Sequence, residues 1–160
     1  MRKKIVRSTS PAASPLSLQG LNIADLATVL VTSETPDFPV ENAFDDHHGP
    51  GGSRWMAEEP GAQMLTVAFD APQAIQQITL EVEEREIERT QEICVALSED
   101  GGRTYRELVR QEYTFSPAGA TFEREEWTVA AQKVTHVQVR IKPDKNDRPC
   151  RAALTTLAFS

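Results

Sequence analysis

The sequence predicts an all-β fold, an antiparallel β-sandwich of the jelly-roll type. Apolar and polar residues alternate with a period of two in five runs, at residues 65–69, 78–82, 93–97, 137–141 and 157–159. Turn-forming residues separate these runs, and segments with a helical period are scarce. Many short strands, each with one buried and one solvated face, are typical of antiparallel sandwiches and jelly rolls.

Four turn-rich segments are expected to connect the strands: FDAPQA at 69–74, SEDGGR at 98–103, SPAG at 116–119 and PDKNDRP at 143–149. SEDGGR is the strongest signal, because Asp-Gly readily adopts the positive φ angles of a tight hairpin. The segment EVEEREIERTQEI begins and ends with period-two runs, as strands do, so its middle is predicted to be a charged connecting loop. The glutamates of EVEEREIE and FEREEW are expected to form an outward-facing stripe. PVENAFDD is expected to form a helical turn.

The length of 160 residues suits a single domain, predicted over residues 21–160. Residues 1–20 begin with basic residues and continue with Ser, Pro and Ala, which predicts a flexible or loosely docked N-terminal arm. That segment lacks the apolar run of a signal peptide, so the expected location is cytoplasmic. No stretch approaches the roughly 18 apolar residues of a membrane span. The net charge of -7 argues against a surface that binds nucleic acid or anionic membranes.

The two cysteines, Cys94 and Cys150, are predicted to be free thiols. They lack the clustered spacing of a zinc site. The adjacent His47 and His48 also have no third ligand at a recognisable spacing, so a transition-metal site is not expected.

The segment AFDDHHGPGGSRW, residues 43–55, sets a polar, glycine-rich stretch between two aromatic side chains. Phe44 and Trp55 are predicted to pack in the core and to fix the two ends of this loop. Trp127 is a further candidate for the core or its rim. The segment is therefore interpreted as a structural loop that also offers ligand contacts.

The order of motifs along the chain resembles the discoidin family, also called the coagulation-factor type C domains. VLVTSE, PVENAFDD, SRW, LTVAFDAPQAIQQITLEVE, ICVALSEDGGRTYREL and VTHVQVRIK follow one another as in that family, over about residues 25–160. The resemblance implies a galactose-binding-like jelly roll that binds ligands through loops at one end. It does not imply catalysis, and the sequence holds no familiar catalytic motif, so no enzyme activity is expected.

The resemblance also implies a structural calcium ion, with Asp45 and Ser53 as ligands. Asp46 and the carbonyl groups of the glycine-rich stretch offer further oxygens of the kind calcium prefers. The chain departs from the family in its closing strand, where Thr156 occupies the position of a glutamate ligand. This change removes one charged ligand, so no cofactor is certain.

Charged side chains in three loop regions are the candidate ligand contacts. Sugar recognition combines polar groups for the hydroxyls with an apolar, commonly aromatic face for the ring. Phe38 is the clear aromatic residue in these loops, so the aromatic face is weakly represented. The candidates are His47, His48 and Arg54 in the first region, Arg85 and Arg89 in the second, and Lys142, Asp144 and Arg148 in the third.

The sequence is compatible with three functions. The first is a non-catalytic module that binds carbohydrate or glycan through its end loops, as the resemblance implies. The second is an intracellular protein-interaction or assembly module, which would carry an apolar patch or a homo-oligomer interface. The third is a nucleic-acid-associated module, which the small basic cluster KPDKNDRPCR favours and the acidic net charge opposes.

Overall fold

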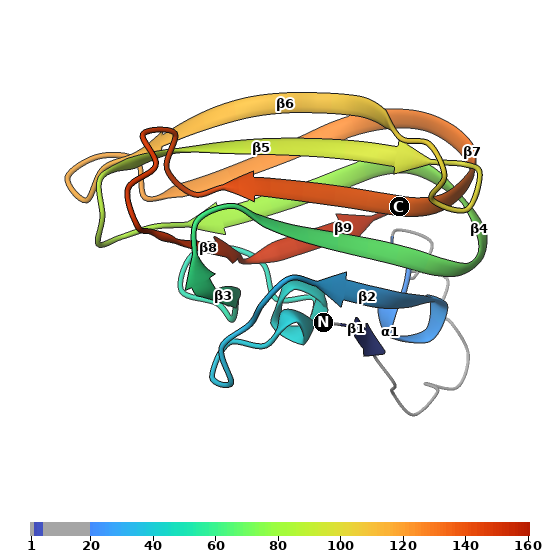
Figure 1. Ribbon diagram of the computed structural model, residues 1–160, viewed down its shortest axis with the longest axis horizontal. Helices are drawn as coiled ribbons and strands as arrows, with labels where there is room; N and C mark the ends of the chain where they lie inside the picture. Colours follow the sequence, from blue (N-terminus) through green and yellow to red (C-terminus); the bar gives the residue numbers. More distant parts are fainter. Residues whose placement is uncertain (1, 5–19) are drawn as a thin grey trace.

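Two long strands, β4 (Gln63–Glu83) and β7 (Phe122–Lys142), form the framework of the computed structural model, which describes residues 2–4 and 20–160. They pair antiparallel, with Gln63 opposite Ile141 at one end of the register and Glu83 opposite Phe122 at the other. Between Ala68 and Gln77 the register shifts three times, and there both strands curve from one layer of the sandwich into the other (Figure 1).

The remaining strands extend these two layers. The sheet order is β1-β2-β4-β7-β5-β6, while β9 pairs with the second half of β4 and β3 pairs with β8. Every pairing is antiparallel, so the predicted antiparallel β-sandwich is confirmed. The other elements are β1 (Arg2–Lys4), α1 (Ile23–Leu26), β2 (Ala27–Val31), η2 (Val40–Phe44), β3 (Trp55–Pro60), β5 (Arg89–Ser98), β6 (Arg106–Phe115), β8 (Arg151–Leu154) and β9 (Thr156–Phe159).

The core consists of the apolar residues of the period-two runs. Val67, Ile78, Val95 and Val139 are fully buried, each on a different strand or half-strand. Burying such side chains removes apolar surface from water, which is the main favourable term in folding. Trp55 is also fully buried, and Phe44 and Trp127 are partly buried against the core, as the sequence predicts.

Three of the predicted connections and the helical turn are present. Residues 84–88, 116–119 and 143–149 lie outside the strands, and PVENAFDD contains η2. The connection after β5 is longer than a tight hairpin, because β5 ends at Ser98 and β6 begins at Arg106. Its Gly101 and Gly102 have the positive φ angles expected there, 80° and 84°.

The turn predicted at residues 69–74 is wrong, because these residues lie within β4. The chain changes direction there through the register shifts rather than through a turn. A shift of this kind leaves residues without a partner in the ladder and increases the local bend. Pro72, which has no N–H to donate, falls between the paired residues Ala68 and Gln73.

The prediction that the glutamates face outward is wrong for Glu81 and Glu83 of β4. Glu81 is 0% exposed and Glu83 is 6% exposed. The loop that precedes β3 covers this end of β4 and contacts both carboxylates. At this end of β4, both faces of the strand are therefore covered, although its sequence alternates between apolar and charged residues.

Cys94 and Cys150 are free and buried, in agreement with the predicted free thiols. The predicted N-terminal arm, residues 1–20, lies largely outside the described residues. Arg2–Lys4 form β1 and pair with Thr28–Leu30 of β2. Within the described part of the chain, no helix combines the length and apolar character needed to cross a membrane.

Candidate functional site

Three loops meet at one end of the sandwich: residues 45–54, 84–88 and 143–149 (Figure 1 shows the last two at its left). The Gly51 N–H donates to Glu83 Oε2 at 3.0 Å, which joins the first loop to the strand that leads into the second. Arg148 Nη2 donates to the carbonyl oxygen of Glu88 at 2.6 Å, which joins the second loop to the third. The structure thus brings together the three regions that hold the predicted ligand contacts.

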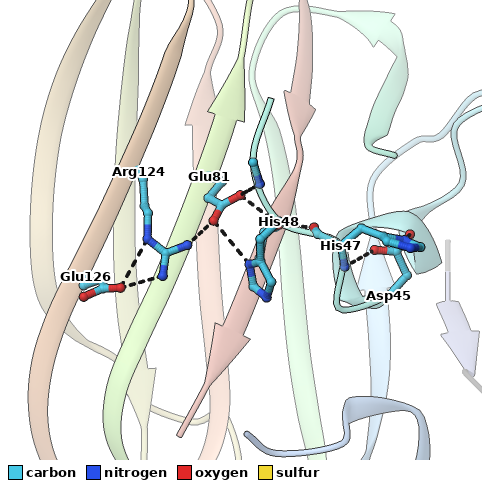
Figure 2. A network of polar contacts seen from close by, with 8 residues as sticks. Asp45, His47, His48, Glu81, Arg124 and Glu126 are labelled. Atoms are coloured by element: carbon cyan, nitrogen blue, oxygen red, sulfur yellow. Dashed lines mark hydrogen bonds and ion pairs between the residues drawn. The ribbon is translucent and has the colours of Figure 1, made fainter. Parts of the chain in front are cut away.

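The buried carboxylate of Glu81 is the centre of the contacts below the first loop (Figure 2). It accepts a hydrogen bond from the Gly49 N–H at 2.7 Å, and His48 Nδ1 lies 3.2 Å from its Oε2. The Arg124 guanidinium forms an ion pair with the same Oε2 from the neighbouring strand β7. The Thr156 hydroxyl oxygen lies 3.4 Å from Glu81 Oε1. The predicted ligand contact His48 is therefore directed partly inward, toward Glu81.

These contacts predict how stability depends on pH. Burial raises the pKa of Glu81, but hydrogen bonds from Gly49 and His48 and then from Arg124 outweigh burial and hold it below 4.5. A carboxylate with a lowered pKa in the folded state stabilises the fold above its unfolded pKa and loses this effect as the pH falls. We expect Tm to change little above about pH 6 and to fall below about pH 4.5. Circular dichroism melts across this range test this, and a Tm that rises on acidification would contradict it.

Glu83 holds the other part of the same loop. Its Oε2 lies 3.0 Å from Arg85 Nη2, and its Oε1 lies 3.9 Å from Arg54 Nη1. The Arg54 guanidinium also lies 5.2 Å from the centre of the Phe38 ring, which makes it a cation–π contact. The Arg85 side chain is 58% exposed and that of Arg54 is 32% exposed. Arg85 therefore offers more of its surface to a ligand than Arg54 does.

Asp45 and Ser53, the predicted calcium ligands, contact each other directly. The Ser53 hydroxyl donates to Asp45 Oδ2, and the His47 N–H donates to Asp45 Oδ1 at 3.1 Å. The carbonyl oxygen of His47 accepts a hydrogen bond from Thr156 Oγ1 at 3.0 Å. Hydrogen bonds lower the pKa of Asp45 although burial raises it.

This arrangement does not fit a calcium ion. Calcium takes six to eight oxygen ligands. The oxygens of Asp45 already accept hydrogen bonds from Ser53 and His47, and the carbonyl of His47 accepts one from Thr156 on β9. Among residues 2–4 and 20–160, no three His, Cys, Asp or Glu side chains are placed to share a metal ion.

Arg89 is buried, and the structure contradicts its predicted role as a ligand contact. It is 2% exposed, and its Nε donates to Glu84 Oε1 at 2.7 Å. Its Nη1 donates to Gln91 Oε1 at 2.8 Å and to the Pro143 carbonyl at 2.6 Å. Glu84 belongs to the 84–88 loop and Pro143 belongs to the 143–149 loop. Arg89 therefore joins these two loops from inside the fold.

A pocket of about 270 Å³ opens beside the third loop, between that loop and the turn after β3. The predicted contacts Lys142, Asp144 and Arg148 line it. Lys142 Nζ lies 3.3 Å from Asp147 Oδ1, and Arg148 forms an ion pair with the buried Asp144. The Arg148 hydrogen bond holds the pKa of Asp144 below its usual range. The lining residues are Pro60, Gly61, Ala62, Lys142, Pro143, Asp144, Asp147, Arg148 and Pro149.

Sequence reasoning missed several residues at this end. Ile87, in the 84–88 loop, is 42% exposed, although an isoleucine is usually buried. A single apolar residue in the charged stretch REIER is the signal that could have identified it. The turn formed by residues 60–62 gave no chemical signal, since its contribution to the pocket depends on its position beside a distant loop.

Comparisons with known proteins identify the fold. No family model matches the sequence, and no curated protein matches it. One similar solved structure is the family 32 carbohydrate-binding module of Clostridium perfringens NanJ, in complex with galactose. It is 13% identical with a TM-score of 0.61, and the alignment covers 88% of this chain and 97% of that one. The third such module of a Clostridium perfringens family 31 glycoside hydrolase is 15% identical with a TM-score of 0.64, covering 92% and 98%.

A third similar structure is the family 32 module of AlyQ, in complex with 4,5-unsaturated mannuronic acid. It is 16% identical with a TM-score of 0.59, and the alignment covers 82% of this chain and 92% of that one. At such low identity these likenesses establish the fold alone. The chain has the galactose-binding-like β-sandwich of these carbohydrate-binding modules, as the sequence predicts.

Proposed function

We propose that this protein is a non-catalytic carbohydrate-binding module, and that a mono- or disaccharide binds in the pocket beside the 143–149 loop. Three predicted ligand contacts, Lys142, Asp144 and Arg148, line one pocket at the loop end of the sandwich. This observation is the main support for the proposal. Its volume of about 270 Å³ is slightly below the range of about 300–1,000 Å³ that is usual for small-molecule sites. A site of this size suits one or two sugar rings better than a long chain.

The pocket combines the two kinds of surface that a sugar requires. Pro60, Pro143 and Pro149 supply apolar walls for the C–H face of a ring. Lys142 and Arg148 supply N–H donors for its hydroxyl groups, directly or through water. No aromatic ring is among the described residues that line the pocket, so we expect modest affinity.

The other two loops extend this surface for larger glycans. His47 and His48 have side chains that are 74% and 42% exposed, and Arg85 and Ile87 are exposed on the adjacent loop. Arg54 packs against the ring of Phe38. We propose these side chains as secondary contacts, with Ile87 as the apolar one. The sugars bound to the NanJ and AlyQ modules support carbohydrate as the ligand class.

The alternatives have less support in the described residues. The large hydrophobic side chains exposed there, Leu30 and Ile87, lie on β2 and on an end loop, so they do not suggest one apolar docking patch. Three of the four cations of the basic cluster pair with carboxylates, and Arg151 is the exposed fourth. These pairs are Lys142–Asp147, Lys145–Glu112 and Arg148–Asp144.

Replacing Lys142 tests the proposed pocket. We expect Lys142→Ala to weaken the binding of a sugar identified on a glycan array about tenfold, a change of about 1.4 kcal/mol. Tm should stay close to that of the wild type, because the Lys142 side chain is 39% exposed and its ion pair lies at the surface. Isothermal titration calorimetry and thermal melts of both proteins provide the measurements.

Lys145→Ala is the matched control. Lys145 is on the same loop, but its ammonium lies 3.4 Å from Glu112 on β6 and it does not line the pocket. We expect its sugar affinity to equal that of the wild type. Equal affinities for the two variants would contradict the proposed site, and a chain that binds no sugar would contradict the proposed function.

A further inference from the structure

We propose that the carboxylates of Glu81 and Glu83 hold the loop of residues 45–54 on the sandwich in place of a structural cation. The loop is then ordered by the protein alone, and the module does not depend on calcium. This inference concerns how the loop is held and does not depend on which ligand the end loops bind.

The loop turns hydrogen-bond donors toward the carboxylates of β4. The N–H groups of Gly49 and Gly51 point at carboxylate oxygens of β4, at 2.7 Å and 3.0 Å. His48 Nδ1 adds a third contact, 3.2 Å from Glu81. A bound cation requires oxygens to face it, whereas here the loop turns nitrogen donors toward the strand. The backbone of residues 49–51 therefore has the polarity that binds anions.

Arginine side chains compensate the charge of these two carboxylates. A buried carboxylate is costly unless a partner neutralises it. Arg124 forms an ion pair with Glu81 from β7, while Arg54 and Arg85 lie beside Glu83. Figure 2 shows Arg124 between Glu81 and Glu126. The positive charge that a divalent ion would supply is thus already present in arginine side chains.

The residue opposite Glu81 is a hydrogen-bond donor and not a second carboxylate. In the pairing of β4 with β9, Glu81 faces Thr156. The Thr156 hydroxyl donates to the His47 carbonyl at 3.0 Å, which an ionised glutamate could not do because it only accepts. The negative charge lies on β4 and the closing strand supplies a donor, so the loop is held by hydrogen bonds at both places.

Metal dependence and loop exchange test this inference on the full chain. We expect Tm in EDTA and in millimolar CaCl₂ to agree within about 1 °C, because a ligand that does not bind cannot shift unfolding. Hydrogen exchange of residues 48–51 should be equally slow in both solutions. In Glu81→Gln, which loses the charge of the central acceptor, exchange of this segment should accelerate about tenfold.

Two further variants complete the experiment. Glu83→Gln affects the Gly51 end of the loop and should accelerate hydrogen exchange at residue 51. It replaces Glu81→Gln as the test if that variant fails to fold. Glu126→Gln is the matched control, because Glu126 pairs with Arg124 at 2.6 Å, is 47% exposed and is not among the loop's hydrogen-bond partners. Its loop should exchange as in the wild type.

A Tm that rises by several degrees with CaCl₂, and that loses this rise in Asp45→Asn, would overturn the inference. Unchanged loop exchange in both the Glu81 and Glu83 variants would also overturn it. Both readouts are made without sugar, so failure here is separate from failure of the proposed carbohydrate site.

Discussion

Trp55→Ala is expected to lower the free energy of unfolding by about 3–5 kcal/mol, the range for truncating a buried tryptophan. Trp55 is fully buried at the start of β3, and its Nε1–H donates to the Ser33 carbonyl at 3.0 Å. The substitution leaves a cavity and removes the donor to a partly buried carbonyl. Urea denaturation followed by circular dichroism measures the loss.

Trp127→Ala provides the comparison for this first prediction. Trp127 is partly buried against the core, and its Nε1 is buried without a hydrogen-bond partner. We expect a smaller loss than for Trp55, because less apolar surface and no hydrogen bond are removed. A loss at Trp55 below about 1 kcal/mol, or below that at Trp127, would contradict the account of how the 45–54 loop is fixed.

Arg89→Ala is expected to destabilise the fold by about 3–5 kcal/mol, the usual cost of breaking a buried ion pair. The substitution removes the partner of Glu84, which is 15% exposed, and the donor to the Pro143 carbonyl. It also removes a cation that lies 5.6 Å from the centre of the Phe115 ring. Urea denaturation again provides the free energy.

Arg85→Ala is the control for this second prediction. Its guanidinium is 58% exposed, so we expect a loss of no more than about 1 kcal/mol. The opposite pattern would contradict the buried role of Arg89. If Arg89→Ala kept full stability and weakened only sugar binding, Arg89 would be a ligand contact, as the sequence first suggested.

The sandwich could be predicted because its signals are local. The alternation of Leu65, Val67 and Phe69 with polar or small residues decides which face of the strand is buried, whatever lies across from it. The 69–74 segment carried the same turn residues as true turns. It forms a bend within β4 because β7 pairs with the strand on both sides of it. That pairing partner is distant in sequence, so no local signal could reveal it.

The candidate site was predictable in its loops but not in the roles of its side chains. Lys142 and Arg148 were predicted at a loop end because charged residues next to turn residues usually lie there, and both line the pocket beside the 143–149 loop. Arg89 has the same local pattern, yet it is buried because the Pro143 carbonyl, 54 residues away, receives its guanidinium. Glu81 belongs to a run whose alternation predicts a solvent-exposed face. It is buried because a loop that begins more than thirty residues earlier in the sequence covers it.

Sugar titration of the ¹⁵N-labelled protein, followed by amide chemical shifts, tests whether a sugar binds in the pocket beside the 143–149 loop. We expect saturable shifts with a mono- or disaccharide, concentrated at Gly61, Lys142, Asp144 and Asp147 around the pocket. Smaller shifts at residues 85–87 are expected with longer glycans. No shift with any sugar at millimolar concentration, or shifts confined to residues away from the three end loops, would contradict the proposed site.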